Sequence, residues 1–490
     1  MSSLSSLLRS ASSRRWLPLA VLLAVATAGG GQTLAHRGWE GSGLSADPWW
    51  RTAIFYQLDP MTFQAAVPPS GSSAGISPLA GIASHLVYLQ SLSVDAIILS
   101  PLRLAPSAPG APPALEPDCG SLDDFDNLIQ QASGSKIRVI VDLPLSSGSD
   151  LNSLARFWLS RGVAGLRVVR DPAAKTPPTP DEVNVALKSL RQVAAGFVGQ
   201  RVLIVDGELG AAAAQAPAPK PDAAPAPKPT PASRSRAHRS APAAKPAPAT
   251  TPLTAQLTLD SQVGFLAHIE GTELHAALEA AEPPGRLTTV APIFATDKTN
   301  LARSFARYAD GKHDVAIARL LATILLTNRS AAVLYAGQEL GLSDPATAIP
   351  WGSPRKDARG KPLPPTGVNV LAEDADGASL LNWYRALSAL HQGNPALASG
   401  TSTLLDTGNP DVVAWLRKPA SGAVAVILCN LSPRPVHVSI LTAIRSATGQ
   451  RNGFLHTLLP SADPSLYTPP APIENVPLPA YGVYLGELKR

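Results

Sequence analysis

The chain has 490 residues, of which 45% are hydrophobic, so it is long enough to bury a large core and to form two or three domains. Its formal net charge is +5, but residues 211–252 contain six basic residues and one acidic residue and therefore account for the whole excess. Because binding to a phosphate backbone needs clustered Lys and Arg on a folded surface, this distribution argues against a nucleic-acid partner.

The amino terminus has the pattern of an export signal. Arg14 and Arg15 precede an apolar run that ends with small residues at Ala26 and Ala28, which predicts a signal peptide over residues 1–28. The alternative is an uncleaved anchor, although a run of roughly 13 to 15 residues is shorter than the ~20 that span a bilayer. We therefore expect a secreted, periplasmic or cell-envelope protein, with membrane contact only if the leader stays uncleaved. A flexible Gly/Ser-rich segment follows to residue 46.

From residue 47 onward, short apolar runs alternate with amphipathic helical segments, a pattern typical of a parallel α/β fold. The predicted strands lie at residues 53–58, 95–100, 137–143, 165–169, 202–206, 287–294 and 331–335, with one more near 257–265. The clearest predicted helices lie at residues 122–132, 180–195 and 315–327. Eight such units predict a (β/α)8 TIM barrel over residues 47–397.

An Ala/Pro/Lys-rich tract interrupts this barrel at residues 211–252. Its composition offers too little apolar surface to offset the entropy of ordering, so the tract is predicted to be a disordered, solvated insertion. Two interpretations remain open. The tract either reaches toward anionic polymers of the cell envelope or is a tolerated surface insertion, since added loop length costs little free energy.

The pattern changes again near residue 398. Short runs at residues 411–417, 424–431 and 436–440 are separated by turn residues and predict an antiparallel β-sandwich over residues 398–490. Export would permit a disulfide between Cys119 and Cys429. However, Cys429 lies in a buried-strand pattern and Cys119 in a distant turn, which favours two free cysteines.

Several ordered segments resemble the α-amylase superfamily, glycoside hydrolase family 13. Residues 49–60, 89–101 and 137–143 resemble its first three barrel strands, and residues 307–311, 333–341 and 379–385 resemble the end of the barrel in α-glucosidases and oligo-α-glucosidases. The resemblance implies a (β/α)8 barrel with a C-terminal β-sandwich, α-glycosidase chemistry and a carbohydrate partner. It leaves the choice between 1,4 and 1,6 bonds open.

The residues that the resemblance implies for catalysis are mostly absent. A retaining glycosidase forms a covalent intermediate through one carboxylate, and Val169 stands at that position. The third strand should close with an Asn-His pair, but Ser146 and Ser147 occupy those places. Asn300 stands where the family has the carboxylate that stabilises an oxocarbenium ion.

Three acidic residues remain candidates for catalysis. Either Asp206 or Glu208 occupies the general-acid position, although a lone carboxylate at a strand end is also typical of a helix cap or a solvated loop. Asp171 is a candidate displaced nucleophile, but it lies two residues beyond Val169 and so roughly 6 to 7 Å farther along the strand axis.

Asp142, Arg167 and Arg303 are predicted to bind substrate, because they match polar family positions. Arg167 has an alternative role, in which it pairs with Asp142 or Asp206 at the barrel mouth. Sugar stacking is a candidate role for Tyr56 and Trp351, with core packing as the alternative.

We predict no cofactor and no metal. The loop at residues 65–75 contains no carboxylate, so calcium would lack hard, charged oxygen ligands there. The family inserts a wall domain after the third strand, but here only residues 148–153 precede the next helix. A shallow, wet pocket is expected, and water weakens electrostatic stabilisation of a transition state.

Three functions follow from these observations. The favoured one is an exported pseudo-glycosidase that binds an α-glucan, an oligosaccharide or an unidentified protein partner without turnover. The second is an active α-glucosidase or α-amylase-type hydrolase with a displaced carboxylate. The third is a structural envelope protein that acts through the Pro-rich insertion. The architecture with lost carboxylates is similar to the heavy chain of heteromeric amino-acid transporters, a non-enzymatic relative.

Overall fold

The computed structural model describes residues 48–63, 76–105, 113–146, 150–214, 257–260, 270–281, 291–298, 301–353, 355–356, 362–363, 367–459 and 470–489. The predicted signal peptide, the segment at residues 29–46 and most of the Ala/Pro/Lys-rich tract lie outside these ranges. Among the helices of the described ranges, none is long and apolar enough to cross a membrane. The barrel and the C-terminal sheets lie in one compact unit.

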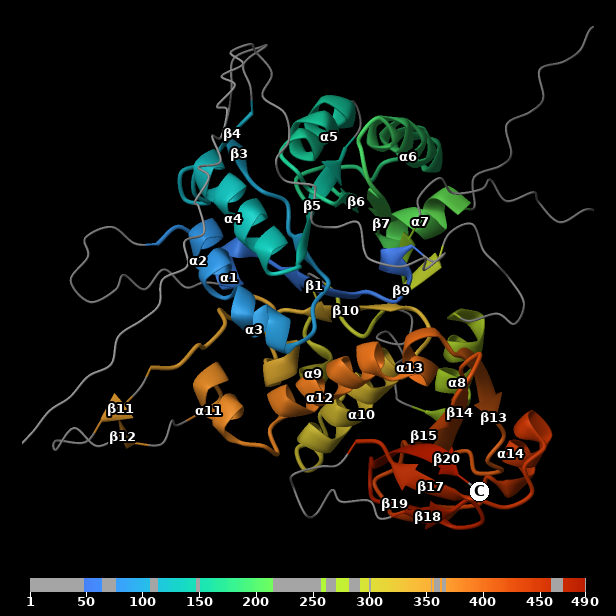
Figure 1. The fold of residues 1–490 in the computed structure, drawn as a ribbon. Helices are drawn as coiled ribbons and strands as arrows, with labels where there is room; N and C mark the ends of the chain where they lie inside the picture. Colours follow the sequence, from blue (N-terminus) through green and yellow to red (C-terminus); the bar gives the residue numbers. More distant parts are fainter. Residues whose placement is uncertain are drawn as a thin grey trace, which may run out of the picture. The chain divides into compact units, whose positions relative to one another are not determined.

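A closed barrel of parallel strands forms the centre of the fold (Figure 1). The order around the barrel is β1-β10-β9-β8-β7-β6-β5-β2, and the pairing of β2 with β1 completes the closure. The strands are β1 (Ile54–Leu58), β2 (Ala96–Leu99), β5 (Arg138–Leu145), β6 (Gly165–Arg170), β7 (Val202–Val205), β8 (Leu257–Asp260), β9 (Ala291–Ala295) and β10 (Ala331–Tyr335). The predicted (β/α)8 barrel is confirmed, and β9 begins four residues later than the apolar run suggested.

Helices surround the barrel, and Figure 1 shows α4, α5 and α6 outside β5, β6 and β7. They are α1 (Pro60–Phe63), α2 (Pro78–Ser84), α3 (Leu86–Ser91), α4 (Leu122–Gly134), α5 (Leu151–Ser160), α6 (Pro180–Ala195), α7 (Gly207–Ala214), α8 (Gly271–Ala281), α9 (Ser304–Arg307), α10 (Asp314–Thr327), α11 (Val370–Ala375), α12 (Leu380–Gly393) and α13 (Pro395–Ser399). Capping boxes begin α4 at Ser121 and α6 at Thr179. These local signals explain why the predicted ranges of both helices agree closely with the structure.

Helix α7 differs from the sequence-based expectation. Its last four residues, 211–214, fall within the range assigned to the disordered insertion, yet their backbone is helical. These residues are alanines, which have the highest intrinsic helix propensity, and they continue a helix that begins directly after Asp206. Local propensity therefore extends the ordered chain a short way into the tract.

The barrel interior is apolar at its centre and polar at the carboxyl ends of its strands. Inward-facing side chains such as Phe55, Ile98 and Ile204 form one cluster, while the alternate residues of each strand pack against the surrounding helices. Beyond this apolar layer, the next inward positions on β5 and β6 are Asp142 and Arg167, both buried. This change of polarity places a charged layer at the mouth where such barrels carry their sites.

The C-terminal part forms antiparallel sheets, as predicted. One sheet has the order β13 (Thr401–Leu405), β14 (Val412–Lys418), β15 (Val424–Asn430), β20 (Val483–Lys489), β17 (Phe454–Thr457) and β18 (Ala471–Pro472). A second pairs β16 (Val436–Val438) with β19 (Val476–Leu478), and α14 (Leu441–Thr448) packs beside them. Cys119 and Cys429 are both buried and free.

Arg417 on β14 connects this sheet with the barrel. Its fully buried guanidinium donates from Nη1 to the carbonyl oxygen of Thr327 at 2.8 Å and from Nη2 to that of Leu397 at 2.8 Å. Thr327 ends α10, and Leu397 lies in α13. One cation therefore satisfies carbonyl groups at two helix ends, which an apolar residue would leave without donors.

Candidate functional site at the barrel mouth

The charged layer is centred on a buried ion pair between neighbouring strands. Asp142 on β5 and Arg167 on β6 are direct register partners. Arg167 donates from Nε to Asp142 Oδ1 at 2.7 Å and from Nη2 to Oδ2 at 2.6 Å, and both side chains are 2% exposed. Burial raises the pKa of the Asp142 carboxyl, and the Arg167 guanidinium opposes part of that shift. The pairing stated as the alternative role of Arg167 is present, with Asp142 as the partner.

Val169 lies two residues beyond Arg167 on the same strand, opposite Pro144 of β5. The period-2 geometry of a strand puts its side chain on the face that carries Arg167, and it is half-buried near the mouth. A valine at this place cannot attack an anomeric carbon or form a glycosyl-enzyme intermediate. The structure thus puts a methyl-bearing side chain beside the ion pair.

Asp171 follows the end of β6 and takes part in a turn. Its backbone N–H donates to Leu145 O at 3.1 Å, and its carboxylate Oδ1 accepts the N–H of Ala173 at 2.9 Å. This is the turn-closing contact that aspartate side chains favour. The carboxylate is engaged by the backbone after the strand, and its role as a displaced nucleophile stays a prediction.

The two candidates for the general acid have different partners. Asp206 follows β7, and its Oδ1 accepts the N–H of Glu208 at 3.1 Å where α7 begins, so it acts as a helix cap. Glu208 lies in the first turn of α7 and accepts a hydrogen bond from Lys298 Nζ at 2.5 Å. The Glu208 carboxylate is thus engaged by the Lys298 ammonium group, and the general-acid role of either residue stays a prediction.

Lys298 comes from the segment after β9, two strands away from β7 around the barrel. Its side chain is 28% exposed, whereas that of Glu208 is 69% exposed, so the pair lies at the rim. Of the other degenerate family positions, Ser146 is half-buried just after β5, while Ser147 and Asn300 lie outside the described residues.

Arg303 is buried and holds two loops at the mouth. It donates from Nη1 to Lys298 O at 3.2 Å and from Nη2 to Ala336 O at 3.3 Å. Its guanidinium carbon also lies 5.2 Å from the centroid of the Tyr335 ring. These contacts give Arg303 a structural role that accounts for its burial. Substrate binding by Arg303 stays a prediction.

Sequence reasoning missed Asp297, a fully buried carboxylate between β9 and Lys298. It accepts hydrogen bonds from Ser304 N at 2.5 Å and Ser304 Oγ at 2.9 Å, which fixes the start of α9. Burial raises its pKa, and Arg307 and Arg303 oppose that shift. Its position directly after an apolar strand was the available signal.

Glu339 is a second buried carboxylate that was not singled out. Its Oε1 accepts the hydroxyl of Tyr56 at 2.7 Å and that of Tyr88 at 2.5 Å. Burial raises the pKa of Glu339, while the two tyrosine hydroxyls oppose the shift. Tyr56 is therefore a packed core residue, in agreement with the alternative given for it.

Trp351 is also occupied by internal contacts. Its indole Nε1 donates to Phe63 O at 3.1 Å, and its ring stacks on His85 with centroids 3.7 Å apart. The Tyr88 ring is nearly perpendicular to that of Trp351, with the two ring centroids 5.1 Å apart. The two aromatic candidates for sugar stacking thus pack in the protein instead of facing a cleft.

The connection after β5 is short, as the sequence indicated. Strand β5 ends at Leu145 and α5 begins at Leu151, so only residues 146–150 separate them and no wall domain intervenes. Among the residues that the structure describes, no cluster of His, Cys, Asp or Glu could hold a metal ion. The loop at residues 65–75 lies outside those residues.

The closed barrel, the C-terminal antiparallel sheets and the polar layer at the strand ends define a protein with the architecture of TIM-barrel glycosidases. A family model described as "Alpha amylase, catalytic domain" matches residues 69–152. The predicted resemblance to the α-amylase superfamily is thereby confirmed.

Known proteins match the chain over different lengths. The trehalose-6-phosphate hydrolase of Escherichia coli (strain K12) is 33% identical over 137 residues, which is 26% of this chain and 24% of that protein. The alpha-glucosidase of Pediococcus pentosaceus is 34% identical over 107 residues, or 21% of this chain and 18% of that protein. The amino acid transporter heavy chain SLC3A2 of Oryctolagus cuniculus is 25% identical over 396 residues, covering 75% of this chain and 63% of that protein. The hydrolase and glucosidase matches thus span at most a quarter of those relatives.

Solved structures extend the likeness in fold to most of the chain. The trehalulose synthase MutB from Pseudomonas mesoacidophila MX-45 matches with a TM-score of 0.60 and 16% identity over 90% of this chain and 100% of that chain. The trehalose-6-phosphate hydrolase TreA of Bacillus licheniformis matches with a TM-score of 0.62 and 14% identity over 91% of this chain and 100% of that chain. At these identities the likeness concerns the fold alone.

Proposed function

We infer that this chain is a pseudo-glycosidase, an α-amylase-type protein that binds a partner without hydrolysing it. The observation that carries the proposal is the state of the charged groups at the barrel mouth. Arg167 is paired with Asp142, Glu208 is paired with Lys298, and Val169 lies two residues beyond Arg167 on β6. A valine at the nucleophile position and a lysine bound to one of the two general-acid candidates, Asp206 and Glu208, support the absence of turnover.

The size of the expected defect follows from the mechanism. A retaining enzyme needs two carboxyl groups about 5 to 5.5 Å apart, and an inverting enzyme needs a separation of about 6.5 to 9.5 Å with a water between them. Both routes need one group that donates a proton and one that is free to attack or to activate water. Removal of a nucleophile typically lowers kcat on the order of a million-fold, so any residual turnover would be at or below the detection limit of a steady-state assay.

The partner is proposed from the relatives. Hydrolases and glucosidases of α-linked sugars among them support a carbohydrate partner, and a transporter heavy chain among them supports a protein partner. The predicted leader, which lies outside the described residues, supports a secreted or cell-envelope location. A barrel mouth without catalytic activity is compatible with carbohydrate binding and with protein binding.

The test is an activity assay on the purified full-length protein with maltose, isomaltose, trehalose 6-phosphate and an activated aryl α-glucoside. An active α-glucosidase serves as the positive control. We expect no product above the blank from the parent chain. Val169→Asp alone should also stay silent, because Lys298 still holds Glu208, whereas Val169→Asp combined with Lys298→Asn is the variant most able to recover trace activity.

The competing hydrolase hypothesis makes the opposite prediction. Robust hydrolysis by the parent chain that disappears in Asp171→Ala or Glu208→Ala would overturn the proposal and support a displaced carboxylate. The envelope-scaffold hypothesis is tested separately by deleting residues 211–252. Sugar or protein binding that survives this deletion would sink the idea that the insertion does the binding.

A further inference from the structure

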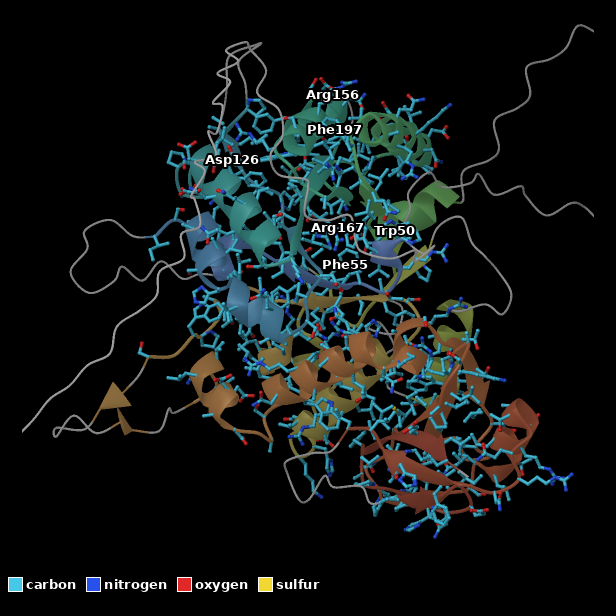
Figure 2. The ribbon with its side chains drawn as sticks, in the orientation of Figure 1. Trp50, Phe55, Asp126, Arg156, Arg167 and Phe197 are labelled. Carbon is cyan, nitrogen blue, oxygen red and sulfur yellow. The ribbon has the colours of Figure 1, made fainter. Side chains whose placement is uncertain are left out.

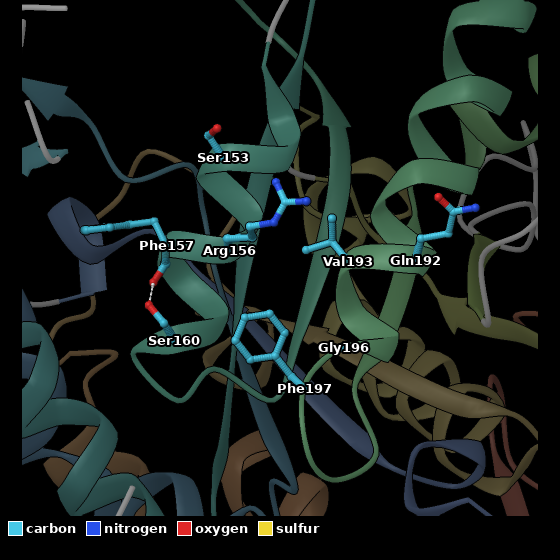
Figure 3. A pocket seen from close by; sticks show the side chains of 8 residues that line it. All are labelled: Ser153, Arg156, Phe157, Ser160, Gln192, Val193, Gly196 and Phe197. Carbon is cyan, nitrogen blue, oxygen red and sulfur yellow. Dashed lines mark hydrogen bonds between the residues drawn. The ribbon is translucent and has the colours of Figure 1, made fainter. Parts of the chain in front are cut away.

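A pocket of about 600 Å³ lies on the outer helical layer of the barrel, between α5 and α6 (Figure 3). Its lining comes from one face of each helix and consists of Ser153, Arg156, Phe157, Ser160, Gln192, Val193, Gly196 and Phe197. Figure 3 shows Arg156 and Phe197 in the space between the helices, while the Phe157 ring points away. Figure 2 places the same two residues among the outer helices and Arg167 farther in, so this pocket is distinct from the barrel mouth.

The pocket combines apolar side chains with the exposed cation of Arg156, which interacts electrostatically with Asp150 at the start of α5. Val193 is buried, Phe197 is half-buried, and the eight lining residues include no carboxylate. The Arg156 side chain is exposed, and within the described part of the chain its guanidinium forms no hydrogen bond or ion pair. This differs from Arg161 at the end of α5, which donates to Asp126 at 2.6 Å and covers the Phe157 ring.

Exposed residues of α6 continue the helix face that lines the pocket. Val185, Lys188 and Gln192 are spaced three and four residues apart, so they line one exposed stripe of that helix. Val185 is 69% exposed, and Val198, just past the end of α6, is 85% exposed. Val185 lies on the same face of α6 as the lining residue Gln192, and Val198 follows the lining residue Phe197, so both add exposed apolar surface next to the pocket.

The groove is also held in shape. Ser189 Oγ on α6 donates to Asn152 Oδ1 on α5 at 2.9 Å, which bridges the two helices beside the pocket. Asp150 and Thr179 cap the starts of α5 and α6 through their side chains. A groove with fixed walls loses little conformational freedom when it binds, and this favours affinity.

We propose that the groove between α5 and α6 docks an acidic amphipathic segment of a partner protein. An apolar side chain of that segment packs on Phe197 and Val193, a carboxylate pairs with Arg156, and flanking apolar groups cover Val185 and Val198. An exposed Arg beside an apolar centre is the residue composition that dominates binding at protein interfaces. A sugar ring in the pocket would leave both valines in water, so the exposed valines favour a longer, amphipathic occupant.

This inference rests on the proposed non-hydrolytic function, in which partner binding is the remaining role. The probes are two fluorescein-labelled amphipathic peptides, each with leucine on one helical face and with glutamate in one peptide and lysine in the other on the opposite face. Fluorescence anisotropy with the full-length protein measures their affinities. We expect the glutamate peptide to bind and Arg156→Glu to weaken it on the order of tenfold, the usual scale for a charge-assisted hydrogen bond.

The matched control is Arg445→Glu on α14, an equal charge change at an exposed position away from the groove. It should leave the affinity unchanged. Arg156→Glu should in turn gain affinity for the lysine peptide, which loss of folding would not produce. Equal affinities for the two peptides, or equal effects of Arg156→Glu and Arg445→Glu, would overturn the proposal.

Other occupants give distinct results. A concentration-dependent dimer that Arg156→Glu dissociates would replace the proposal with a contact between two copies of this chain. Displacement of the peptide by maltoheptaose would replace it with a carbohydrate subsite. The aryl α-glucoside assay on the same preparations separates failure of the proposed function from failure of the docking proposal. Turnover would contradict the pseudo-glycosidase function. Absence of both peptide binding and turnover would contradict only the docking proposal.

Discussion

The barrel mouth and the junction between the barrel and the C-terminal sheet use buried arginines in contrasting ways. At the junction, Arg417 donates to three backbone carbonyl groups, one at the end of α10 and two in α13 and its C-cap, and so connects the sheet to both helices. At the mouth, Arg167 is engaged by one carboxylate, Asp142, next to a valine. The contrast teaches that a buried arginine can stabilise the fold in two ways, by joining backbone carbonyl groups of separate helices or by pairing with one carboxylate on the neighbouring strand.

The largest effect is expected at the mouth. Asp142→Ala removes the only carboxylate bonded to Arg167 among the described residues and leaves a buried cation, which should lower the free energy of unfolding by about 3 to 5 kcal/mol. Urea denaturation monitored by circular dichroism measures the loss. The double variant Asp142→Leu with Arg167→Met removes both charges and should cost less than the single change. A larger loss in the double variant would contradict the view that the pair is structurally replaceable.

Arg417→Ala tests the junction and should have the next largest effect. The carbonyl groups of Thr327, Leu397 and Gly400 would lose a charged donor, at a cost of about 2 to 4 kcal/mol. The same denaturation experiment applies, with Arg445→Ala as an exposed control that should shift stability by less than about 0.5 kcal/mol. If the two variants are equally stable, the junction does not depend on this arginine.

Glu339 provides a pH-dependent comparison within the barrel. Burial raises its pKa above the ordinary value of 4.5, so its contribution to stability is fully present below that value and is lost as the pH rises through the folded pKa. Glu339→Gln keeps an acceptor for Tyr56 and Tyr88 but does not titrate. The stability of the parent relative to this variant should therefore fall as the pH increases from about 4.5 toward neutrality. A difference that is independent of pH would contradict the raised pKa.

The smallest effect is expected at the exposed start of α10. The side chain and backbone of His313, followed by the backbone of Lys312, lower the pKa of Asp310 from 3.8 to about 2. This depressed value stabilises the fold above pH 3.8, and the contribution is lost as the pH falls through about 2. Asp310→Asn should therefore lower the stability slightly at neutral pH, and the difference from the parent should disappear as the pH falls through about 2. Thermal denaturation across that pH range measures it.

Local patterns predicted the fold well because apolar strand runs and helix caps act over a few residues. The range predicted for α6, for example, follows from Thr179 and Glu182 in the capping box and the apolar spacing after them. The residue types at the mouth could also be compared from the sequence, since Val169 stands where the resemblance implies a carboxylate. The missed carboxylates, Asp297 and Glu339, were harder to find because segments distant in the sequence bury them, and the neighbouring residues give no sign of that burial.

The sequence by itself determined the alternation of strands and helices, the change to antiparallel sheets and the presence of Val169 near the end of β6, since each depends on residue types close together along the chain. Only the tertiary structure decided which charges meet. The register of β5 on β6 selects Asp142 instead of Asp206 as the partner of Arg167, and barrel closure brings Lys298 to Glu208 across 90 residues of sequence. Ion pairs depend on distances of a few ångströms, and only the folded barrel sets those distances.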